Sequence, residues 1–371
     1  MTFDRLRHSL CARDFARCIC YFSLAAKASE IMSNQDISVF TMNFWEHFNL
    51  ENSFLGYLLQ NAFGQFRVAE SEENADVVFT SVFMRSAPKF KDKTVWVIWE
   101  NVRPSFDLAN YSISSDFDDY GGRNVRCPLW YAQLKWPGYN PPIGTGNADN
   151  HEYEAPISLE STLVERNVSP REKFCCLVAR NPERHRMLAV ELLSRFGQVD
   201  VYGNAAKLPL RQSKYTVLPC YTFNLCFENS MFPGYYTEKV LHAWAAGCVP
   251  LYFADRFYSE DFNPAAIINR ADFATASNFV EKVGRIYNSR DAVQEITRQP
   301  LLLKRPSLER VVTFLQEAVT KIRRETRLQF PINLPRANLS RKRAVLLRVG
   351  QKIIATADSL KRKFQSENAE R

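Results

Sequence analysis

The sequence has no long hydrophobic run, and its cysteines follow no recognisable pattern. No uninterrupted apolar stretch in the 371 residues approaches the roughly 20 residues that a membrane-spanning helix needs. The nine cysteines match no zinc-site spacing, and their odd number does not favour a disulfide framework. An apolar fraction of 46% excludes a disordered chain. We therefore expect a cytoplasmic protein with reduced thiols, either soluble or peripheral to a membrane.

The charges are unbalanced at one end of the chain, where positive charge is in excess. Residues 341–371 contain nine Lys or Arg and three Asp or Glu, which account for six of the eight net positive charges. The remainder is nearly neutral, so the high pI does not predict nucleic-acid binding, and we expect no nucleic-acid partner. Apolar residues recur every three or four positions within the tail. This pattern predicts a basic amphipathic helix in which residues 341–364 bind an anionic membrane surface, with docking on the protein's own body or on a partner as the alternative.

Short apolar runs alternate with helical patterns along the rest of the chain. Helices are predicted around residues 54–59 and 187–196, where apolar residues form one stripe. Strands are predicted over residues 37–42, 75–80, 94–99, 174–179 and 199–203. This alternation favours an α/β fold with open, doubly wound parallel sheets.

The length of the chain is sufficient for two domains. Residues 140–169 are rich in glycine and proline, which indicates a ligand-binding loop or an interdomain linker. Helices through residues 279–283 and 311–315 are expected to close the second domain. The predicted division is an N-terminal extension over 1–34, domains over 35–165 and 166–335, and a basic tail over 336–371.

Residues 223–253 read as strand, loop, helix and strand. Thr237 is the predicted N-cap of the helix, and Gly247 is predicted to end it. Lys239 falls in the first turn, where the helix dipole disfavours a cation. It is therefore either a solvated surface lysine or a group that faces a phosphate. Arg186, near the start of another predicted helix, allows the same two interpretations.

Glu100 directly follows the predicted strand over 94–99. Ligands of open α/β sheets bind outside the carboxyl ends of the strands, so this carboxylate is placed for chemistry. A helix cap or a salt bridge with Arg103 is the alternative. The acidic run from Asp116 to Asp119 resembles the Asp-x-Asp motif that holds a metal in other transferases, but such runs are common in loops, and we expect no metal site there.

A longer pattern resembles a known family. Phe227-Glu-Asn-Ser230, Tyr235, Thr237-Glu-Lys239, Gly247 and Val249-Pro250 are similar, in order and spacing, to the signature of the α-1,3/4-fucosyltransferases, glycosyltransferase family 10. Other segments resemble bacterial members of that family, namely Asn43-Phe-Trp45, Trp99-Glu-Asn101, Asp116-Phe-Asp118, Arg126 to Tyr131 and Asp261-Phe-Asn-Pro264. The resemblance covers residues 36–275 well and excludes residues 1–34.

The resemblance implies a GT-B architecture, in which two Rossmann-like domains face a cleft. The first domain would hold the acceptor, an oligosaccharide or glycolipid, and the second would hold GDP-fucose. The implied reaction is inverting transfer of L-fucose from GDP-β-L-fucose to a hydroxyl of N-acetylglucosamine or glucose, forming an α-1,3 or α-1,4 linkage in protein glycosylation or related pathways. No cofactor or metal is required.

Matching positions also imply roles for single residues. Glu100 would be the general base, Lys239 and Arg186 would hold the pyrophosphate, Glu238 would contact the ribose or fucose, and Asn229 and Tyr235 would make further donor contacts. This agrees with the chemistry, because inversion needs one carboxylate to take the acceptor proton. Fixed cations can stabilise the charge that develops on the departing GDP without a metal.

The sequence departs from the family pattern at two positions. Animal members usually have an acidic residue where this chain has Gly234, and many members have glycine where it has Ala254. Two other functions remain open: a GT-B transferase with a different nucleotide-sugar donor, and a non-catalytic module that binds glycans or membranes. The predicted location is the cytoplasm, peripheral on the cytoplasmic face of the inner membrane.

Overall fold

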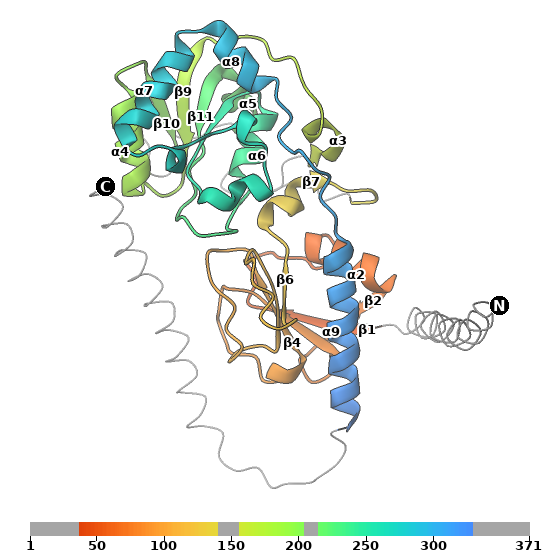
Figure 1. Cartoon of the computed structure of the whole chain (residues 1–371). Helices are drawn as coiled ribbons and strands as arrows, with labels where there is room; N and C mark the ends of the chain where they lie inside the picture. Colours follow the sequence, from red (N-terminus) through yellow and green to blue (C-terminus); the bar gives the residue numbers. More distant parts are fainter. Residues whose placement is uncertain (1–36, 140–155, 204–213, 329–371) are drawn as a thin grey trace, which may run out of the picture.

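The computed structural model describes residues 37–139, 156–203 and 214–328. These residues form two parallel sheets, each covered by helices and loops, with one sheet above the other in the view of Figure 1. The N-terminal extension over 1–34 and the basic tail over 336–371, with its predicted membrane-binding helix, lie outside the described residues. In the described part of the chain, no helix combines the length and apolar character that crossing a membrane would require.

The centre of the first sheet is built from three short strands whose residues are all buried, whereas its edge strand over residues 66–68 is mostly exposed. Its order is β2-β1-β3-β4-β5-β6, with every neighbouring pair parallel. The helix α2 (Phe54–Phe63) confirms the helix predicted from the apolar stripe around residues 54–59. It begins at Ser53, whose hydroxyl accepts a hydrogen bond from the amide of Gly56. The strands are β1 (Ile37–Met42), β2 (Phe66–Val68), β3 (Val77–Thr80), β4 (Thr94–Ile98), β5 (Tyr111–Ser114) and β6 (Asn124–Arg126).

The second sheet repeats this topology in the order β10-β9-β11-β12-β13, again entirely parallel. Its strands are β9 (Lys173–Val178), β10 (Val199–Tyr202), β11 (Tyr221–Leu225), β12 (Val249–Tyr252) and β13 (Ile268–Asn269). Its helices are α4 (Arg184–Leu193), α5 (Lys214–Val217), α6 (Lys239–Ala245), α7 (Ala276–Tyr287) and α8 (Arg290–Thr297). The predicted pair of doubly wound sheets is therefore confirmed.

The helix α9 (Glu309–Leu328) corrects one prediction, because it packs on the first sheet and not on the second. It runs beside α2 in Figure 1, and the side-chain amide of Gln316 donates a hydrogen bond of 2.8 Å to the carbonyl of Ala62. Arg323 reaches Asp76 at 3.0 Å. The apolar stripe of a helix shows which face is buried, but it does not identify the sheet that covers that face.

The segment predicted as a loop or linker over 140–169 also differs from the expectation. Among its described residues, β8 (Ile157–Ser158) pairs in parallel with β7 (Leu134–Lys135), and α3 (Leu159–Thr162) follows directly. Ser158 starts this short helix by accepting a hydrogen bond from the amide of Ser161. These elements are too short for periodicity to reveal them in the sequence.

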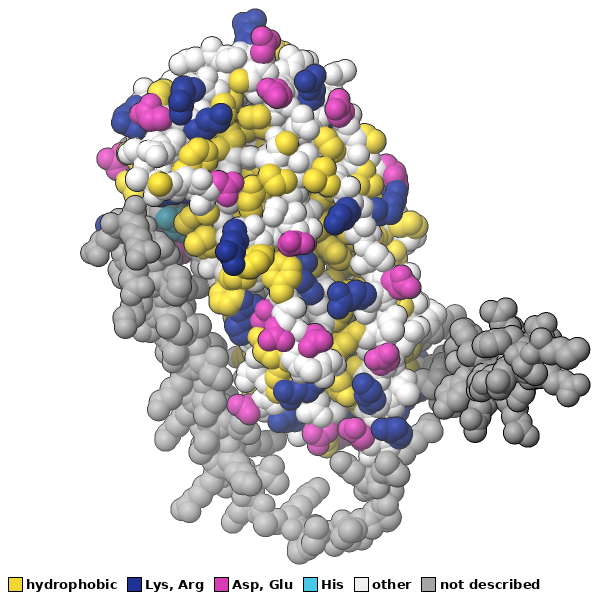
Figure 2. Space-filling model, viewed as in Figure 1, with side chains coloured by type: hydrophobic (Ala, Val, Ile, Leu, Met, Phe, Trp, Pro, Cys, Tyr) yellow, Lys and Arg dark blue, Asp and Glu magenta, His cyan; other side chains and the backbone are white. Residues whose placement is uncertain are grey.

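One apolar cluster joins the two halves, while β9 and β11 of the second sheet pack in clusters of their own. A single cluster of buried side chains extends from β1 and α2 of the first sheet to Tyr236, Val240 and Leu241 around α6 of the second. On the surface shown in Figure 2, lysine and arginine side chains are interspersed with acidic ones and with apolar patches. The described part of the chain therefore presents no single-sign face in this view.

Candidate active site

A carboxylate from the first sheet meets a loop of the second. Glu100 follows β4, and its Oε2 accepts a hydrogen bond of 3.3 Å from the hydroxyl of Tyr235. Tyr235 belongs to the loop between β11 and α6 and is only 5% exposed. Burial raises the pKa of Tyr235 well above its usual value, and Glu100 and Glu228 add to the effect. The hydroxyl therefore stays protonated and orients the Glu100 carboxylate.

Arg103, the alternative partner predicted for Glu100, makes an ion pair of 2.7 Å with Asp116. The rest of the predicted acidic run builds a turn, in which Asp118 accepts from the amide of Tyr120 and Asp119 accepts from the amide of Gly121. Within the described ranges, no cluster of His, Cys, Asp and Glu has the makings of a metal site. The acidic run thus has a local structural use.

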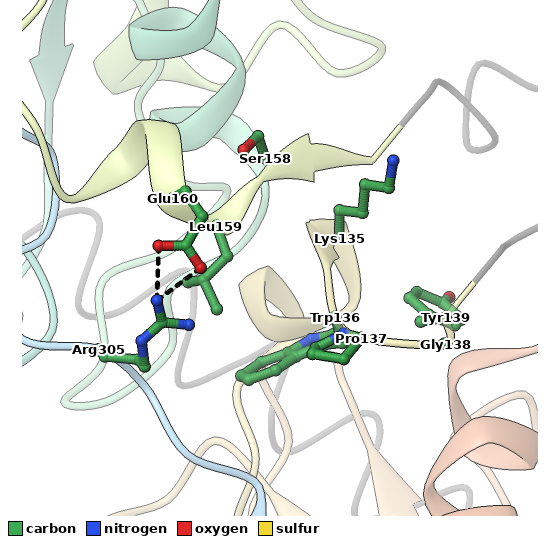
Figure 3. A pocket seen from close by; sticks show the side chains of 9 residues that line it. All are labelled: Lys135, Trp136, Pro137, Gly138, Tyr139, Ser158, Leu159, Glu160 and Arg305. Atoms are coloured by element: carbon green, nitrogen blue, oxygen red, sulfur yellow. Dashed lines mark hydrogen bonds and ion pairs between the residues drawn. The ribbon is translucent and has the colours of Figure 1, made fainter.

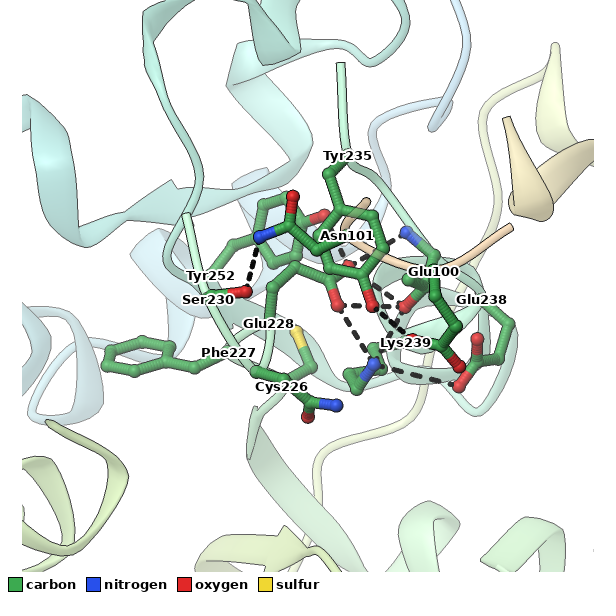
Figure 4. A network of polar contacts seen from close by, with 12 residues as sticks. Glu100, Asn101, Cys226, Phe227, Glu228, Ser230, Tyr235, Glu238, Lys239 and Tyr252 are labelled. Carbon is green, nitrogen blue, oxygen red and sulfur yellow. Dashed lines mark hydrogen bonds and ion pairs between the residues drawn. The ribbon is translucent and has the colours of Figure 1, made fainter. Parts of the chain in front are cut away.

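Glu228 lies at the centre of the polar network in Figure 4. It is 1% exposed, and its Oε1 accepts from the amide of Thr237 at 2.8 Å, from the Thr237 hydroxyl at 2.9 Å and from the Tyr252 hydroxyl at 2.8 Å. Its Oε2 accepts from the Thr237 hydroxyl at 2.9 Å and from the Lys239 ammonium at 2.8 Å. The carboxylate therefore joins strand β12 to the start of α6.

Lys239 is held on the protein side by this carboxylate. Its Nζ donates to Glu228 and, at 2.8 Å, to the hydroxyl of Thr237, while Glu238 lies 3.9 Å away. Burial alone would lower the pKa of Lys239, but Glu228 and Glu238 raise it above its usual value. The side chain of Lys239 is 24% exposed, so part of it lies at the protein surface.

The start of α6 differs slightly from the prediction. The N-cap is Glu238, one residue beyond the predicted Thr237, and its side chain makes no capping hydrogen bond. The Thr237 hydroxyl is occupied by Glu228 and Lys239, which explains why it does not cap the helix. The predicted end is confirmed, since Gly247 follows the helix at a φ of +84°.

Glu238 is also charged in this environment. Burial would raise its pKa, but the neighbouring Lys239 and Lys214 lower it to about 2. Its side chain is 25% exposed beside Lys239. The predicted contacts of Glu238 and Lys239 with a donor therefore belong to one site, although their roles stay predictions.

Arg186 is brought to the same place from α4. It is 3% exposed, and its guanidinium donates to the carbonyls of Phe227 and Asn181 and to Asn229 Oδ1, the last at 2.7 Å. Four of its five N–H groups are used in these contacts. Arg186 therefore fixes the loop that carries Glu228 and Asn229, and its predicted contact with a pyrophosphate stays a prediction.

The structure adds residues that the sequence reasoning did not include among the site residues. Glu228 was part of the recognised motif, but only its burial reveals its central position. Asn101 donates to the Ser230 hydroxyl, and Arg103 donates to the carbonyl of Pro233 at 3.4 Å. These contacts dock the loop between β11 and α6 on the carboxyl edge of the first sheet. The position of Asn101 directly after Glu100 was the signal that could have suggested this.

Figure 3 shows a pocket of about 240 Å³ that is lined by other residues. It is bounded by residues 135–139 and 158–160 and by Arg305, which pairs with Glu160. The pocket thus borders the start of the segment predicted as a loop or linker and includes residues 158–160 from within it. The residues of the Glu228 network take no part in its wall.

Two family models match the chain in succession. Residues 39–133 match the N-terminal domain of α-(1,3)-fucosyltransferase FucT, and residues 168–296 match the C-terminal part of glycosyltransferase family 10, the fucosyltransferases. Together the two matches cover more than half of the chain. The chain belongs to glycosyltransferase family 10. In this family 10 chain the first match contains Glu100 and the second contains Arg186, Glu228 and Lys239, so both halves of the network lie in matched segments.

Individual relatives support the same family. The α-(1,3)-fucosyltransferase FucT of Helicobacter pylori is 26% identical over 284 residues, which make up 69% of this chain and 58% of that protein. The 4-galactosyl-N-acetylglucosaminide 3-α-L-fucosyltransferase 9 of Mus musculus is 32% identical over 134 residues, 33% of this chain and 37% of that protein. This family 10 chain therefore spans only part of the length of these relatives.

The fold is shared with solved structures. The crystal structure of an α1,3-fucosyltransferase superposes with a TM-score of 0.61 at 22% identity, covering 77% of this chain and 90% of the other. The same comparison with an α1,3-fucosyltransferase bound to GDP-fucose gives a TM-score of 0.59 at 21% identity, covering 76% and 90%. The family 10 chain thus has the predicted GT-B fold.

Proposed function

We propose that this protein is an inverting fucosyltransferase. It transfers L-fucose from GDP-β-L-fucose to a hydroxyl of N-acetylglucosamine or glucose in an oligosaccharide or glycolipid, forming an α-1,3 or α-1,4 linkage. Its family supports fucosyl transfer, and the names of two relatives support an α-1,3 linkage. The solved structure of an α1,3-fucosyltransferase with GDP-fucose supports the donor. The observation that carries the proposal is the meeting of Glu100 from the first sheet with Tyr235 from the loop beside Lys239 in the second.

The proposed reaction is a single displacement. The acceptor hydroxyl attacks C1 of fucose, its proton passes to Glu100, and the bond from C1 to the phosphate oxygen breaks with its electron pair leaving on GDP. The exposed Glu100 carboxylate is accessible to such a hydroxyl, and Tyr235 orients it. Attack opposite the leaving group inverts the configuration at C1.

The remaining donor contacts are proposed from the same network. The Lys239 ammonium stabilises the charge on the departing diphosphate. Arg186 acts on the phosphate beside it, Glu238 contacts the ribose or fucose, and Asn229 contacts the donor next to Arg186. With these cations in place the reaction needs no metal or other cofactor.

The first experiment measures donor turnover. We expect GDP-fucose, and not GDP-mannose or UDP-galactose, to be consumed with a β-galactosyl-N-acetylglucosamine acceptor. Turnover of another nucleotide sugar instead would favour the alternative of a GT-B transferase with a changed donor. Failure to bind GDP in a calorimetric titration would favour the second alternative, a non-catalytic module that binds glycans or membranes.

Substitution of the proposed base tests the mechanism. Glu100→Gln removes the proton acceptor but keeps the size of the side chain, so transfer should fall at least 100-fold, because a general base contributes about 10²–10⁴ in rate. GDP affinity, measured by calorimetry, should stay within twofold of wild type. Unchanged transfer in this variant would remove Glu100 as the base.

Membrane association through residues 341–364, on the cytoplasmic face of the inner membrane, also remains a proposal that rests on the charge pattern of the tail. Deletion of residues 338–371 should reduce binding to vesicles that contain anionic lipid while fucosyl transfer to a soluble acceptor persists. Sedimentation with vesicles measures the first effect. Equal sedimentation of the full and shortened chains would dispose of this proposal.

A further inference from the structure

The environment of Glu228 has a feature that the proposed reaction does not use. Its carboxylate is 1% exposed, yet it is surrounded by donors from both Thr237 and Tyr252 and by a single close ammonium, that of Lys239. Removing a carboxylate from water costs several kcal/mol, which only well-placed partners can offset. A neutral side chain could satisfy the two hydroxyl groups without that cost. The charge of Glu228 is therefore balanced by two cations, the Arg186 guanidinium at longer range and the Lys239 ammonium in direct contact.

The ammonium of Lys239 is constrained by this arrangement. Lysine has three N–H donors, and two of them are directed to Glu228 Oε2 and Thr237 Oγ1, both at 2.8 Å. Glu238 Oε1 lies 3.9 Å away, beyond the length of a hydrogen bond. These two contacts leave one N–H of the ammonium for a ligand, and the 24% exposure of the side chain means that a ligand can approach it from the surface.

Glu228 is itself held from several elements. Tyr252 comes from the end of β12, and the ring of His185 in α4 contacts the backbone carbonyl of Glu228 at 3.0 Å. Arg186 anchors the preceding carbonyl, that of Phe227, at 2.6 Å. Because β12 and α4 hold Glu228 in place, the position of the Lys239 ammonium depends on both elements.

We propose that Glu228 is a positioning residue that holds the Lys239 ammonium, through Oε2 and the shared Thr237 hydroxyl, so that its third N–H binds the diphosphate of a nucleoside-diphosphate donor. This inference rests on the proposed function, because it needs the diphosphate to bind beside Lys239. Glu228 does not touch the donor. It acts by keeping the ammonium in place and charged before the donor arrives.

A double-mutant cycle with GDP as the probe separates this role from a structural one. Calorimetry would measure GDP affinity for the wild type, Glu228→Gln, Lys239→Met and the double variant. Each single substitution should weaken binding at least tenfold, and the double variant should bind no more weakly than Lys239→Met alone. If Glu228→Gln weakens GDP binding by the same factor in the Lys239→Met protein as in the wild type, the two residues act independently and the inference is overturned.

The pH dependence gives a second readout that a structural role would not move. The charged and titratable groups around the Lys239 ammonium include Glu228, Glu238, Arg186, Cys226, Tyr252 on the Glu228 carboxylate, His242 one turn further along α6, and Lys214 from α5. Burial lowers the pKa of Lys239, and the Glu228 charge opposes this effect. When that charge is removed, the pKa of Lys239 falls and the ammonium loses its proton at lower pH. Between pH 7.5 and 10, GDP affinity should therefore begin to fall at lower pH in Glu228→Gln than in wild type. Coincident profiles would contradict the inference.

Two further variants keep the inference testable if Glu228→Gln does not fold. Glu228→Asp keeps the charge, so it should bind GDP more tightly than Glu228→Gln and keep the wild-type pH profile. Glu72→Gln is the matched control, because Glu72 is a 7% exposed glutamate that accepts a hydrogen bond of 2.7 Å from the Lys89 amide in the first sheet. It should leave GDP affinity unchanged. Should Glu228→Gln not fold, the comparison of Glu228→Asp with wild type, in the presence and absence of Lys239→Met, decides the same question.

The outcomes distinguish this inference from the proposed function. Wild-type protein that binds GDP but transfers no fucose would overturn the transfer reaction alone. Additive effects in the cycle, with normal transfer by wild type, would overturn the positioning role alone. Absence of GDP binding by wild type would overturn both.

Discussion

Gly234 is the residue at which the local backbone is most closely constrained by the other sheet. It has a φ of +89°, and a Cβ built on it would lie 2.2 Å from the carbonyl oxygen of Ser115, at the end of β5. A side chain is therefore excluded both by the backbone conformation and by the neighbouring strand end. This explains why the chain has glycine directly before Tyr235, where animal relatives usually have an acidic residue.

We expect Gly234→Ala to displace the loop that carries Tyr235. Transfer should fall more than tenfold, and the free energy of unfolding should decrease by about 1–3 kcal/mol, because the strained conformation and the backbone clash add. Initial rates and denaturant unfolding measure the two effects. Gly138→Ala is the control, since Gly138 has a φ of +77° but no atom within 4 Å of the added Cβ. Equal losses in both variants would show that strain alone matters.

At the level of single elements, α9 decides how the chain is tied together. It begins after the last helices of the second sheet and packs against α2, β6 and the short turn Lys91–Lys93 of the first half. Arg323 in α9 meets Asp76, whose carboxylate also accepts from the amide and hydroxyl of Ser38 at 2.8 and 2.9 Å. The carboxylate therefore connects α9 to the first strand.

This contact should make the docking of α9 sensitive to acid. Burial raises the pKa of Asp76, but the hydrogen bonds from Arg323 and Ser38 lower it by a larger amount. The pKa of Asp76 therefore lies below the usual 3.8. A carboxyl with a lowered folded-state pKa contributes stability above the unfolded-state pKa and loses it as pH falls through the folded-state value. The free energy of unfolding should thus fall more steeply from pH 5 to pH 2.5 in wild type than in Asp76→Asn.

Denaturant unfolding at several pH values measures this difference. At pH 6 the Asp76→Asn variant should be less stable than wild type by about 2 kcal/mol, as expected for lost hydrogen bonds to a charged group. Asp107→Asn, at an exposed aspartate, is the control and should follow the wild-type profile. Parallel profiles for wild type and Asp76→Asn would refute the assignment.

At the scale of the whole molecule, an ion pair joins the two sheets beside the shared apolar cluster. Arg126, at the end of β6, binds Asp261 through contacts of 2.7 and 3.0 Å, and Trp130 Nε1 donates to the same carboxylate at 2.9 Å. The side chains of Arg126 and Asp261 are 18% and 8% exposed. The guanidinium also lies over the ring of Phe117, 4.3 Å from its centroid.

Asp261→Asn should therefore destabilise the whole protein and not one half of it. Loss of one partner leaves a buried guanidinium uncompensated, which typically costs about 3–5 kcal/mol. We expect a single unfolding transition at lower denaturant concentration. Arg305→Ala is the control, because it removes an exposed pair with Glu160 and should have no measurable effect. Two separate transitions in Asp261→Asn would mean that the ion pair couples otherwise independent domains.

The sequence by itself determined most strands of both sheets and the helices α2, α4, α6 and α7, because apolar runs and stripes record which faces are buried. The strands β2, β5 and β6 were not among the predicted elements. The sequence also determined the family, and it placed Glu100 at the carboxyl end of a strand, since that position depends only on where the strand stops. Local signals such as Gly247 predicted the end of α6 for the same reason. Such features depend on residues within one or two turns of the chain.

Only the tertiary structure decided which side chains meet. The contact of Glu100 with Tyr235 spans 135 positions, and the contact of Glu228 with Tyr252 spans 24. It also decided that α9 covers the first sheet, and that Thr237 serves Glu228 and not the helix end. Apolar periodicity indicates which face of a helix or strand is buried. The residues that pack against that face, or that pair with a buried charge, come from another element. These partners are known only when the elements are packed together.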